Sequence, residues 1–271
     1  MDLPRILYET VPGRVLLRLL IDSRVSFLAG RLMDSRLSAV LIPGFIRRNR
    51  IEMSDYLGTS YPTFNDFFCR RIDPEKRPVD QAGNHLAAPC DGLLSVYRIS
   101  GGLVMPVKQS SYTVSELLRD ERLAKEFEGG TSMVFRLCVH HYHRYIFPDS
   151  ARRGSEEVHI DGVLHTVRPA ALHKVPVFIE NTREYVVLET EHFGKMIQME
   201  VGAMLVGRIC NHRLRERVKR GQEKGYFQYG GSTIILLAKR GAVQLSGKLF
   251  EATENQIEIP VRMGQKIGVC R

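Results

Sequence analysis

The sequence predicts a mainly β (α+β) protein, in which an antiparallel sandwich- or barrel-like body follows an N-terminal amphipathic helical segment. From about residue 86 onward, short alternating or β-branched runs such as "EYVVLET" and "STIILLAK" are separated by Gly, Asp and Asn. This pattern is typical of many short antiparallel strands. The 271 residues, 44% hydrophobic and 25% charged, suffice for one large domain with an appendage.

Residues 1–53 are expected to form a basic, membrane-associating helical segment. Residues 1–50 hold nine arginines against four acidic residues. Arg14, Arg18 and Asp22 recur every four positions among leucines, isoleucine and valine, which indicates a helix with a polar stripe and a wide apolar face. Such a segment packs on the body or lies at the headgroup layer of a bilayer, and the sequence leaves both open.

Two further helices are expected. One covers 26–41, with apolar residues along one side and Pro43-Gly44 ending it. The other covers 113–127 inside the β-rich part, where Thr113 followed by Glu116 matches a capping box.

The net charge of +9 favours polyanionic partners, namely nucleic acid, an anionic membrane or acidic ligands. The basic, helix-like run at 213–225 lacks interleaved aromatic residues, so no nucleic acid is expected as a partner. No apolar stretch approaches the ~20 residues that span a bilayer, and no secretory signal is evident. Five scattered cysteines without a CxxC pair are expected to be reduced. These features predict a peripheral protein on the cytoplasmic face of a membrane, with bacteria favoured as the source.

Several polar residues are candidates for chemistry. Asp91 in "APCDG" is a turn aspartate or a catalytic carboxylate. "HHYHRYIFP" clusters His140, His141 and His143, but no acidic or thiol ligand stands at a suitable spacing, so no metal is expected. His165 lies in another apolar run, where an imidazole is either a core residue or a proton shuttle.

Two glycines interrupt a predicted strand in "YFQYGGSTIILL", just before Ser232. A glycine pair within a strand marks a turn, a bend or a close backbone approach. A hairpin turn is one interpretation. The other is that the bond between Gly231 and Ser232 is cut, because glycine tolerates strained dihedral angles that admit the serine hydroxyl to the preceding carbonyl.

The segments "FNDFFCRRIDPEKRPVD", "APCDG", "YHRY", "EVGAMLVGRI" and "GYFQYGGSTIILL" occur in this order, and the chain from about residue 60 onward resembles the phosphatidylserine decarboxylase family. The resemblance implies a proenzyme that cuts itself at Gly231–Ser232. The serine hydroxyl attacks the preceding carbonyl, β-elimination leaves dehydroalanine, and hydrolysis gives a pyruvoyl group and ammonia. The products are a β chain, 1–231, and an α chain of 40 residues, 232–271, which stay associated. The β-rich catalytic domain is expected to cover 54–271, and the cut falls within it.

Serine is a weak nucleophile and needs a base that a carboxylate orients. By the resemblance Asp91 is that carboxylate. The best-known branch of the family has a second histidine where this chain has Ile146, so His143 and His165 remain the candidate bases, with His143 favoured. Thr233 or nearby N–H groups are candidate donors to the oxyanion.

The resemblance also implies pyruvoyl-dependent decarboxylation of phosphatidylserine to phosphatidylethanolamine and CO₂ through a Schiff base, with Ser232 as the precursor of the cofactor and no metal. His143 is the favoured proton donor. The partners are then phosphatidylserine and an anionic membrane, and whether the chain forms a homodimer is left open. Two alternatives remain, a pyruvoyl decarboxylase of a soluble amino acid or conjugate and a non-catalytic membrane-binding β-protein.

Overall fold

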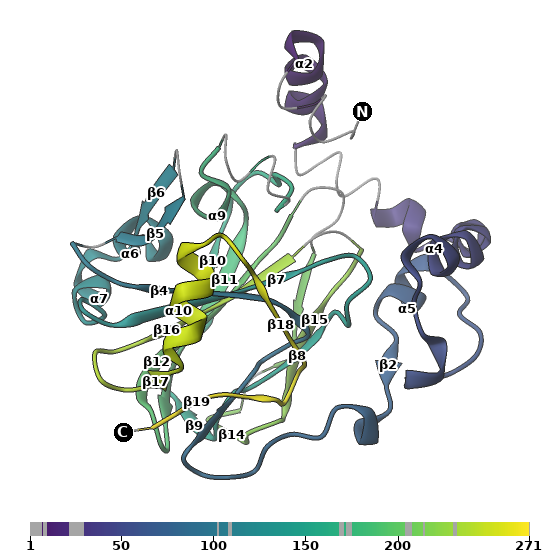
Figure 1. Ribbon diagram of the computed structural model, residues 1–271. Coiled ribbons are helices and arrows are strands. Elements are labelled where there is room, and N and C mark those ends of the chain that lie inside the picture. Colours follow the sequence, from purple (N-terminus) through teal and green to yellow (C-terminus); the bar gives the residue numbers. More distant parts are fainter. Residues whose placement is uncertain are drawn as a thin grey trace.

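The body is built on a large antiparallel sheet (Figure 1). The computed structural model describes residues 7, 10–21, 30–101, 103–107, 110–167, 171, 175–203, 208–213, 215–229 and 232–270. Within these ranges the large sheet has nine strands, in the order β14 (Arg217–Val218), β9 (Ala151–Arg153), β11 (Arg183–Thr190), β12 (Gly194–Val201), β16 (Ser232–Ala238), β7 (Thr131–Leu137), β4 (Gly92–Arg98) and β18 (Ile259–Val261), with β10 (Val158–Ile160) paired to β11.

Smaller sheets surround it. They are β13 (Ile209–Asn211), β15 (Glu223–Phe227) and β8 (Arg144–Ile146); β17 (Gln244–Leu245), β19 (Lys266–Val269) and β3 (His85–Ala87); β1 (Tyr56–Leu57) with β2 (Arg71–Ile72); and β5 (Leu103–Val107) with β6 (Ser110–Thr113). All strand pairs are antiparallel. The mainly β prediction is confirmed, and the described strands form open sheets rather than a closed barrel.

The helices are short. They are α2 (Val11–Leu20), α4 (Ile42–Asn49), α5 (Phe64–Phe68), α6 (Val114–Leu118), α7 (Glu121–Lys125), α9 (Val177–Glu180) and α10 (Gly247–Glu254), with 3-10 turns η1 (Arg36–Leu41), η2 (Met53–Asp55) and η3 (Pro74–Lys76). None of the helices in the described ranges has the length and apolar character needed to cross a bilayer.

The large sheet buries a hydrophobic cluster on each face, because successive side chains of a strand point to opposite sides. On one face Ile235 and Leu237 of β16 pack in the same cluster as Leu117 of α6. On the other face Ile234 packs with Tyr145 of β8 and other residues of the small sheets. Ser232 shares its face with Ile234, and the small sheets therefore cover the side of β16 on which Ser232 lies.

Within the N-terminal segment, η1 and α4 pack on α5. Phe45 of α4 meets the ring of Phe64 edge-on, with ring centroids 5.1 Å apart. The hydroxyl of Ser38 in η1 accepts a hydrogen bond from the Phe64 backbone N–H at 2.8 Å. Thr63 caps α5 by accepting from the N–H of Asp66 at 3.1 Å. These contacts attach the basic segment beside the start of β16.

The structure corrects three local expectations. In the described part of the predicted 26–41 helix, one helical turn at 30–33 is followed by a turn and by η1. Pro43 lies in the first turn of α4 instead of ending a helix, because proline lacks only an N–H that the first turn leaves unpaired. The basic run at 213–225 contains β14 and the start of β15 rather than a helix. The Thr113–Glu116 capping box is confirmed, although the predicted helix divides into α6 and α7.

Candidate active site

Ser232 is the first residue of β16 and is completely buried. Its strand is hydrogen-bonded to β12 on one side and to β7 on the other, where Ser232 stands opposite Leu137. Gly231 lies outside the described residues, and so does Gly230. The hydroxyl of Ser232 is therefore described, whereas the geometry of the predicted scissile bond is not.

His143 is the imidazole that contacts Ser232. Its Nδ1 lies 3.3 Å from Ser232 Oγ, and its Nε2 lies 3.1 Å from the carbonyl oxygen of Cys138. Because a carbonyl can only accept, Nε2 carries the proton and Nδ1 is left with a free lone pair. The serine hydroxyl then donates to Nδ1, which is the arrangement that a general base requires.

The surroundings of His143 keep it neutral. Its ring is fully buried and packs on Phe68, with centroids 4.1 Å apart. Burial, and then the positive charge of Arg70, hold the pKa of His143 well below its usual 6.5. The lowered pKa favours the neutral imidazole, whose free Nδ1 lone pair can accept a proton.

Asp91 does not contact His143 among the described residues. Its carboxylate pairs with Arg77, whose Nη2 and Nε lie 2.7 and 2.8 Å away, and accepts from the N–H of Met263 at 2.8 Å. These bonds tie the start of β4 to the residues around Arg77 and Met263. The carbonyl of Cys138 occupies the position at His143 Nε2 that a carboxylate would take in a Ser-His-Asp triad.

His165 is held near the start of β11 and the end of β12. The Asn181 side chain accepts from His165 N–H at 2.8 Å and donates to the carbonyl of Gly202, the residue after β12, at 2.7 Å. The imidazole Nε2 of His165 is paired with Glu180 at 3.0 Å. Burial lowers the pKa of His165, while Glu180 acts in the opposite direction. No contact between His165 and Ser232 is present in the described ranges.

His141 and His140 are the other histidines of the cluster that contains His143. His141 Nδ1 accepts from the N–H of Cys138 at 3.0 Å, and burial lowers the pKa of His141 to about 4. His140 is exposed.

The Thr233 hydroxyl is buried without a hydrogen-bond partner among the described residues, and strand alternation directs it away from the face of Ser232. Nowhere in the described ranges do three or more His, Cys, Asp or Glu side chains form a group that could hold a metal ion.

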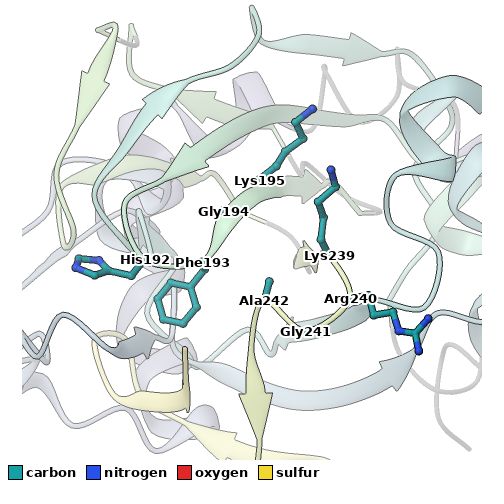
Figure 2. Close-up of a pocket in the computed structure, with 8 residues that line it drawn as sticks. All are labelled: His192, Phe193, Gly194, Lys195, Lys239, Arg240, Gly241 and Ala242. Carbon is teal, nitrogen blue, oxygen red and sulfur yellow. The ribbon is translucent and has the colours of Figure 1, made fainter. Parts of the chain in front are cut away.

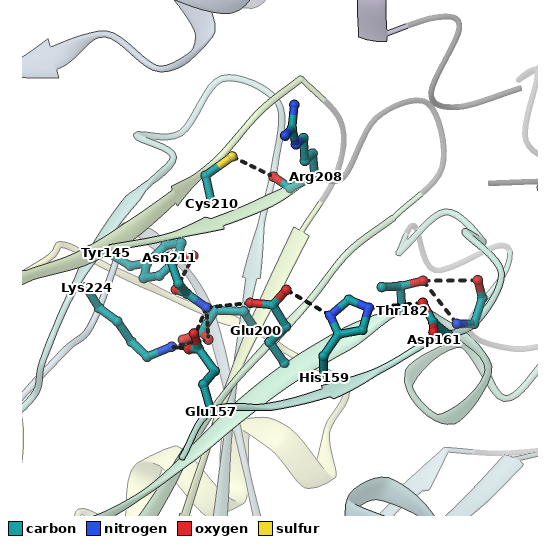
Figure 3. A network of polar contacts seen from close by, with 12 residues as sticks. Tyr145, Glu157, His159, Asp161, Thr182, Glu200, Arg208, Cys210, Asn211 and Lys224 are labelled. Atoms are coloured by element: carbon teal, nitrogen blue, oxygen red, sulfur yellow. Dashed lines mark hydrogen bonds and ion pairs between the residues drawn. The ribbon is translucent and has the colours of Figure 1, made fainter. Parts of the chain in front are cut away.

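Sequence reasoning missed a buried charge network beside the site (Figure 3). Lys224 Nζ lies 2.5 Å from Glu200 Oε2 and 2.8 Å from Glu157 Oε1, and both Lys224 and Glu200 are fully buried. Asn211 donates to Glu157 at 2.7 Å and accepts from the hydroxyl of Tyr145 at 2.9 Å. Burial raises the pKa of Glu200 to about 7. Tyr145 lies in β8, and Glu200 of β12 stands opposite Ile234 of β16, so the network lies on the face of the sheet that carries Ser232.

A surface pocket of about 300 Å³ lies at the opposite end of β16 (Figure 2). Its lining comes from the β11–β12 turn and the residues after β16, including His192, Lys195 and Lys239. Seven residues of extended chain, Ser232–Ala238, separate it from Ser232 by about 20 Å at 3.3 Å per residue. This pocket is therefore not part of the Ser232 site.

Comparison with known proteins gives a single family. A family model described as phosphatidylserine decarboxylase matches residues 64–269. The chain is 43% identical over 265 residues to phosphatidylserine decarboxylase proenzyme 2 of Clostridium acetobutylicum, which covers 97% of this chain and 90% of the relative. A phosphatidylserine decarboxylase proenzyme of Clostridium perfringens is 40% identical over 96% of this chain and 90% of its own length. One of Ruminiclostridium cellulolyticum is 37% identical over 97% and 90%.

Proposed function

The chain belongs to the phosphatidylserine decarboxylase family, and on that premise we propose that it cuts its own backbone at Gly231–Ser232 and then decarboxylates phosphatidylserine to phosphatidylethanolamine. The relatives are named proenzymes, which agrees with a chain that matures by cleavage. The serine required for such a cut matches Ser232, the residue that opens β16.

The observation that carries the proposal is the contact between Ser232 Oγ and the unprotonated Nδ1 of His143, at 3.3 Å in a fully buried site. A buried serine beside a neutral imidazole is the pairing that activates a hydroxyl for attack on a carbonyl carbon. The geometry favours His143 over His165 as the base, because His165 is engaged with Glu180.

In the first step His143 Nδ1 takes the hydroxyl proton while Ser232 Oγ bonds to the carbonyl carbon of Gly231. The C–N bond of the amide then breaks, and the proton passes to the departing nitrogen, so an amide becomes an ester without any outside reagent. The Nε2–H bond to the Cys138 carbonyl keeps the ring in the tautomer that this transfer needs. Burial of both residues excludes the water that would compete for the carbonyl.

The residues present fit a pyruvoyl group derived from Ser232. The serine side chain is enclosed, and the polar partner described for it is a neutral imidazole. A pyruvoyl group at this position would supply an electrophilic ketone and an electron sink for decarboxylation. His143 is placed to hold or deliver a proton at this position.

We also propose that 1–53 is the membrane-associating segment, that 54–271 is the catalytic domain, and that the protein lies peripherally on the cytoplasmic face of a bacterial membrane. Supporting this, Leu37 and Val40 in η1 are 82% and 80% exposed, and the adjoining α4 carries Arg47 and Arg48 in its last turn. Apolar side chains next to basic ones suit an anionic lipid surface.

The two chains are expected to stay together after the cut. The strand β16 of the α chain pairs on both sides with strands of the β chain, namely β12 and β7, and cleavage before Ser232 would leave the pairing from Thr233 onward intact.

The test is a comparison of wild type with Ser232→Ala. Wild type should give two chains on a denaturing gel, a hydrazine-reactive carbonyl on the smaller one, and labelled CO₂ from carboxyl-labelled phosphatidylserine but not from free serine. The Ser232→Ala protein should remain one chain and release none. A folded wild type that stays uncut would refute the proposal, and release from free serine at equal efficiency would favour a soluble substrate.

A further inference from the structure

Helix α5 contacts both the base proposed for self-cleavage and the segment that leads into the proposed scissile bond. Phe68, its last residue, packs on the His143 ring with centroids 4.1 Å apart. Asn65, in its first turn, accepts a hydrogen bond from the backbone N–H of Tyr229 at 3.1 Å through Oδ1. Tyr229 stands three residues before Ser232. One short helix therefore holds two groups that lie far apart in the chain.

The Asn65 side chain is buried, and both ends of its amide are paired. Its Nδ2 donates to Asp34 Oδ1 at 2.8 Å, while its Oδ1 accepts from the Tyr229 N–H. The orientation of the amide follows from chemistry, because only its oxygen accepts from an N–H and only its nitrogen donates to a carboxylate. A buried amide is unfavourable unless it is hydrogen-bonded. Here its bonds fix the backbone two residues before Gly231.

The side chain of Tyr229 is held by the same helix. Its ring meets the rings of Phe64 and Phe68 edge-on, with centroids 4.9 and 5.3 Å apart, which is a preferred geometry of aromatic pairs. Two glycines follow Tyr229 in the chain, and glycine loses more conformational freedom than any other residue when it is fixed. An anchor directly before them limits the positions that the scissile carbonyl can take.

Phe68 lies against the imidazole of His143. Both side chains are fully buried, and their ring planes are inclined by 33°. The χ2 torsion of histidine has broad minima, so contacts must set the angle of the ring. Its two nitrogens face Ser232 Oγ and the Cys138 carbonyl. Packing against Phe68 disfavours tilts that would lengthen these contacts, and it keeps water from the ring.

We propose that Asn65 and Phe68 are positioning residues for self-cleavage, in which Asn65 holds the segment before the scissile bond and Phe68 holds the imidazole. Both roles rest on the proposed function, since they concern the same reaction. Ser232 is fixed by its strand, which pairs on both sides. The carbonyl of Gly231 and the ring of His143 need other anchors, and about 1 Å of misplacement costs on the order of 100-fold in rate.

The Asn65 role is tested by the rate of cleavage in a pulse and chase at pH 7.5 and pH 5.5. Asn65→Leu keeps the size of the side chain but cannot accept from the Tyr229 N–H, and it should slow cleavage about 10- to 100-fold at both pH values. Asp34→Ala is the matched control. It removes the other bond of the amide at an exposed position, where water can replace the carboxylate, so cleavage should stay near the wild-type rate.

The Phe68 role predicts a different result in the same assay. Phe68→Ala should slow cleavage more at pH 5.5 than at pH 7.5, because a hydrated His143 regains a pKa nearer 6.5 and is protonated at the lower pH. Phe127→Ala is the control, since it removes an equally buried ring from the cluster on the opposite face of the sheet, and it should keep the wild-type pH dependence. The neighbouring groups that also lower this pKa remain in both variants; they are Arg70, His141 and His140.

A second measurement needs no cleavage and uses the uncut Ser232→Ala protein. Adding Asn65→Leu should speed hydrogen exchange of the Tyr229 amide about tenfold, as for the loss of one hydrogen bond. Adding Phe68→Ala should raise the pKa of His143, followed by ¹⁵N NMR of its ring. Unchanged exchange or an unchanged pKa would contradict the corresponding role.

The outcomes separate this inference from the proposed function. A wild type that stays uncut refutes the function itself. If wild type is cut, normal cleavage by Asn65→Leu, or equal slowing by Asp34→Ala, overturns the role of Asn65. A wild-type pH dependence in Phe68→Ala overturns the role of Phe68. Should either variant fail to fold, Asn65→Ala and Phe68→Leu are milder substitutions with the same expected directions, and wild-type behaviour of these would count against the inference equally.

Discussion

Replacing His143 by alanine should slow self-cleavage by a factor of about 10² to 10⁴, the usual contribution of a positioned general base. The imidazole is the described group in contact with Ser232 Oγ, at 3.3 Å, and its removal leaves the buried hydroxyl without that acceptor. The expected product is a folded proenzyme that stays uncut for hours while wild type is processed.

The pH dependence gives a second, independent measure of the same residue. An imidazole with a pKa of 6.5 is about 90% neutral at pH 7.5 and about 10% neutral at pH 5.5, so its activity as a base would fall about ninefold. Burial and Arg70 lower the pKa of His143, which moves this fall to lower pH. The cleavage rate of wild type should therefore change much less than ninefold between pH 7.5 and 5.5.

The assay is a pulse of labelled methionine during cell-free synthesis, followed by a chase at each pH and separation of the two chains on a gel. Both products carry label, because Met263 lies in the 40-residue chain. His165→Ala and His141→Ala serve as controls and should process at rates near wild type. Normal cleavage by His143→Ala, or a block caused only by His165→Ala, would refute the assignment of the base.

Three other perturbations follow from the described contacts. The pKa of Glu200 is raised from 4.5 to about 7, so its contribution to the free energy of unfolding is complete below pH 4.5 and is lost as pH rises through 7. Glu200→Gln should reduce that loss, by about 3 kcal/mol at 1.4 kcal/mol per pH unit. An unfolding free energy in urea that falls equally with pH in both proteins would contradict this. Asp91→Ala removes the carboxylate that lies 2.7 Å from Arg77 Nη2. It should lower the free energy of unfolding, measured with a chemical denaturant, by about 3 to 5 kcal/mol, as for other broken buried pairs. Unchanged stability would show that the pair is not structurally important. Leu37→Asp, at an 82% exposed position, should leave stability unchanged and reduce sedimentation with anionic liposomes at least tenfold, given about 1.5 to 3 kcal/mol for burying a leucine; undiminished binding would remove η1 from the membrane-contacting surface.

The sequence predicted the features that depend on local patterns. Alternating apolar residues identified the strands, because a half-buried strand repeats every two residues, and the Thr113–Glu116 pair marked a helix start. Pro43 misled because proline is compatible with the first turn of a helix as well as with a stop. The order of strands in the sheet was not predicted, since it follows from pairing between residues far apart, such as Ser232 with Leu137.

The candidate site shows the same division between local and long-range information. Ser232 could be found from its glycine neighbours and the family resemblance. The sequence favoured His143 over His165 as the proposed base but left both open. The contacts that bear on this choice are long-range, since His143 is 89 residues from Ser232 in the chain and the imidazole of His165 is paired with Glu180 at 3.0 Å.

The partner of His143 Nε2 has a consequence for the chemistry. A carboxylate at that nitrogen would fix the tautomer and also stabilise the imidazolium, whereas the Cys138 carbonyl fixes the tautomer with no full negative charge. Burial and Arg70 disfavour the imidazolium further. His143 is therefore suited to hold a proton only briefly, between Ser232 Oγ and the departing amide nitrogen. Such a base is adequate for the proposed cleavage, because each molecule would be cut once and a slow step would suffice. It also returns to the neutral form at once, and a neutral imidazole beside residue 232 does not repel the cationic amino group of an arriving substrate.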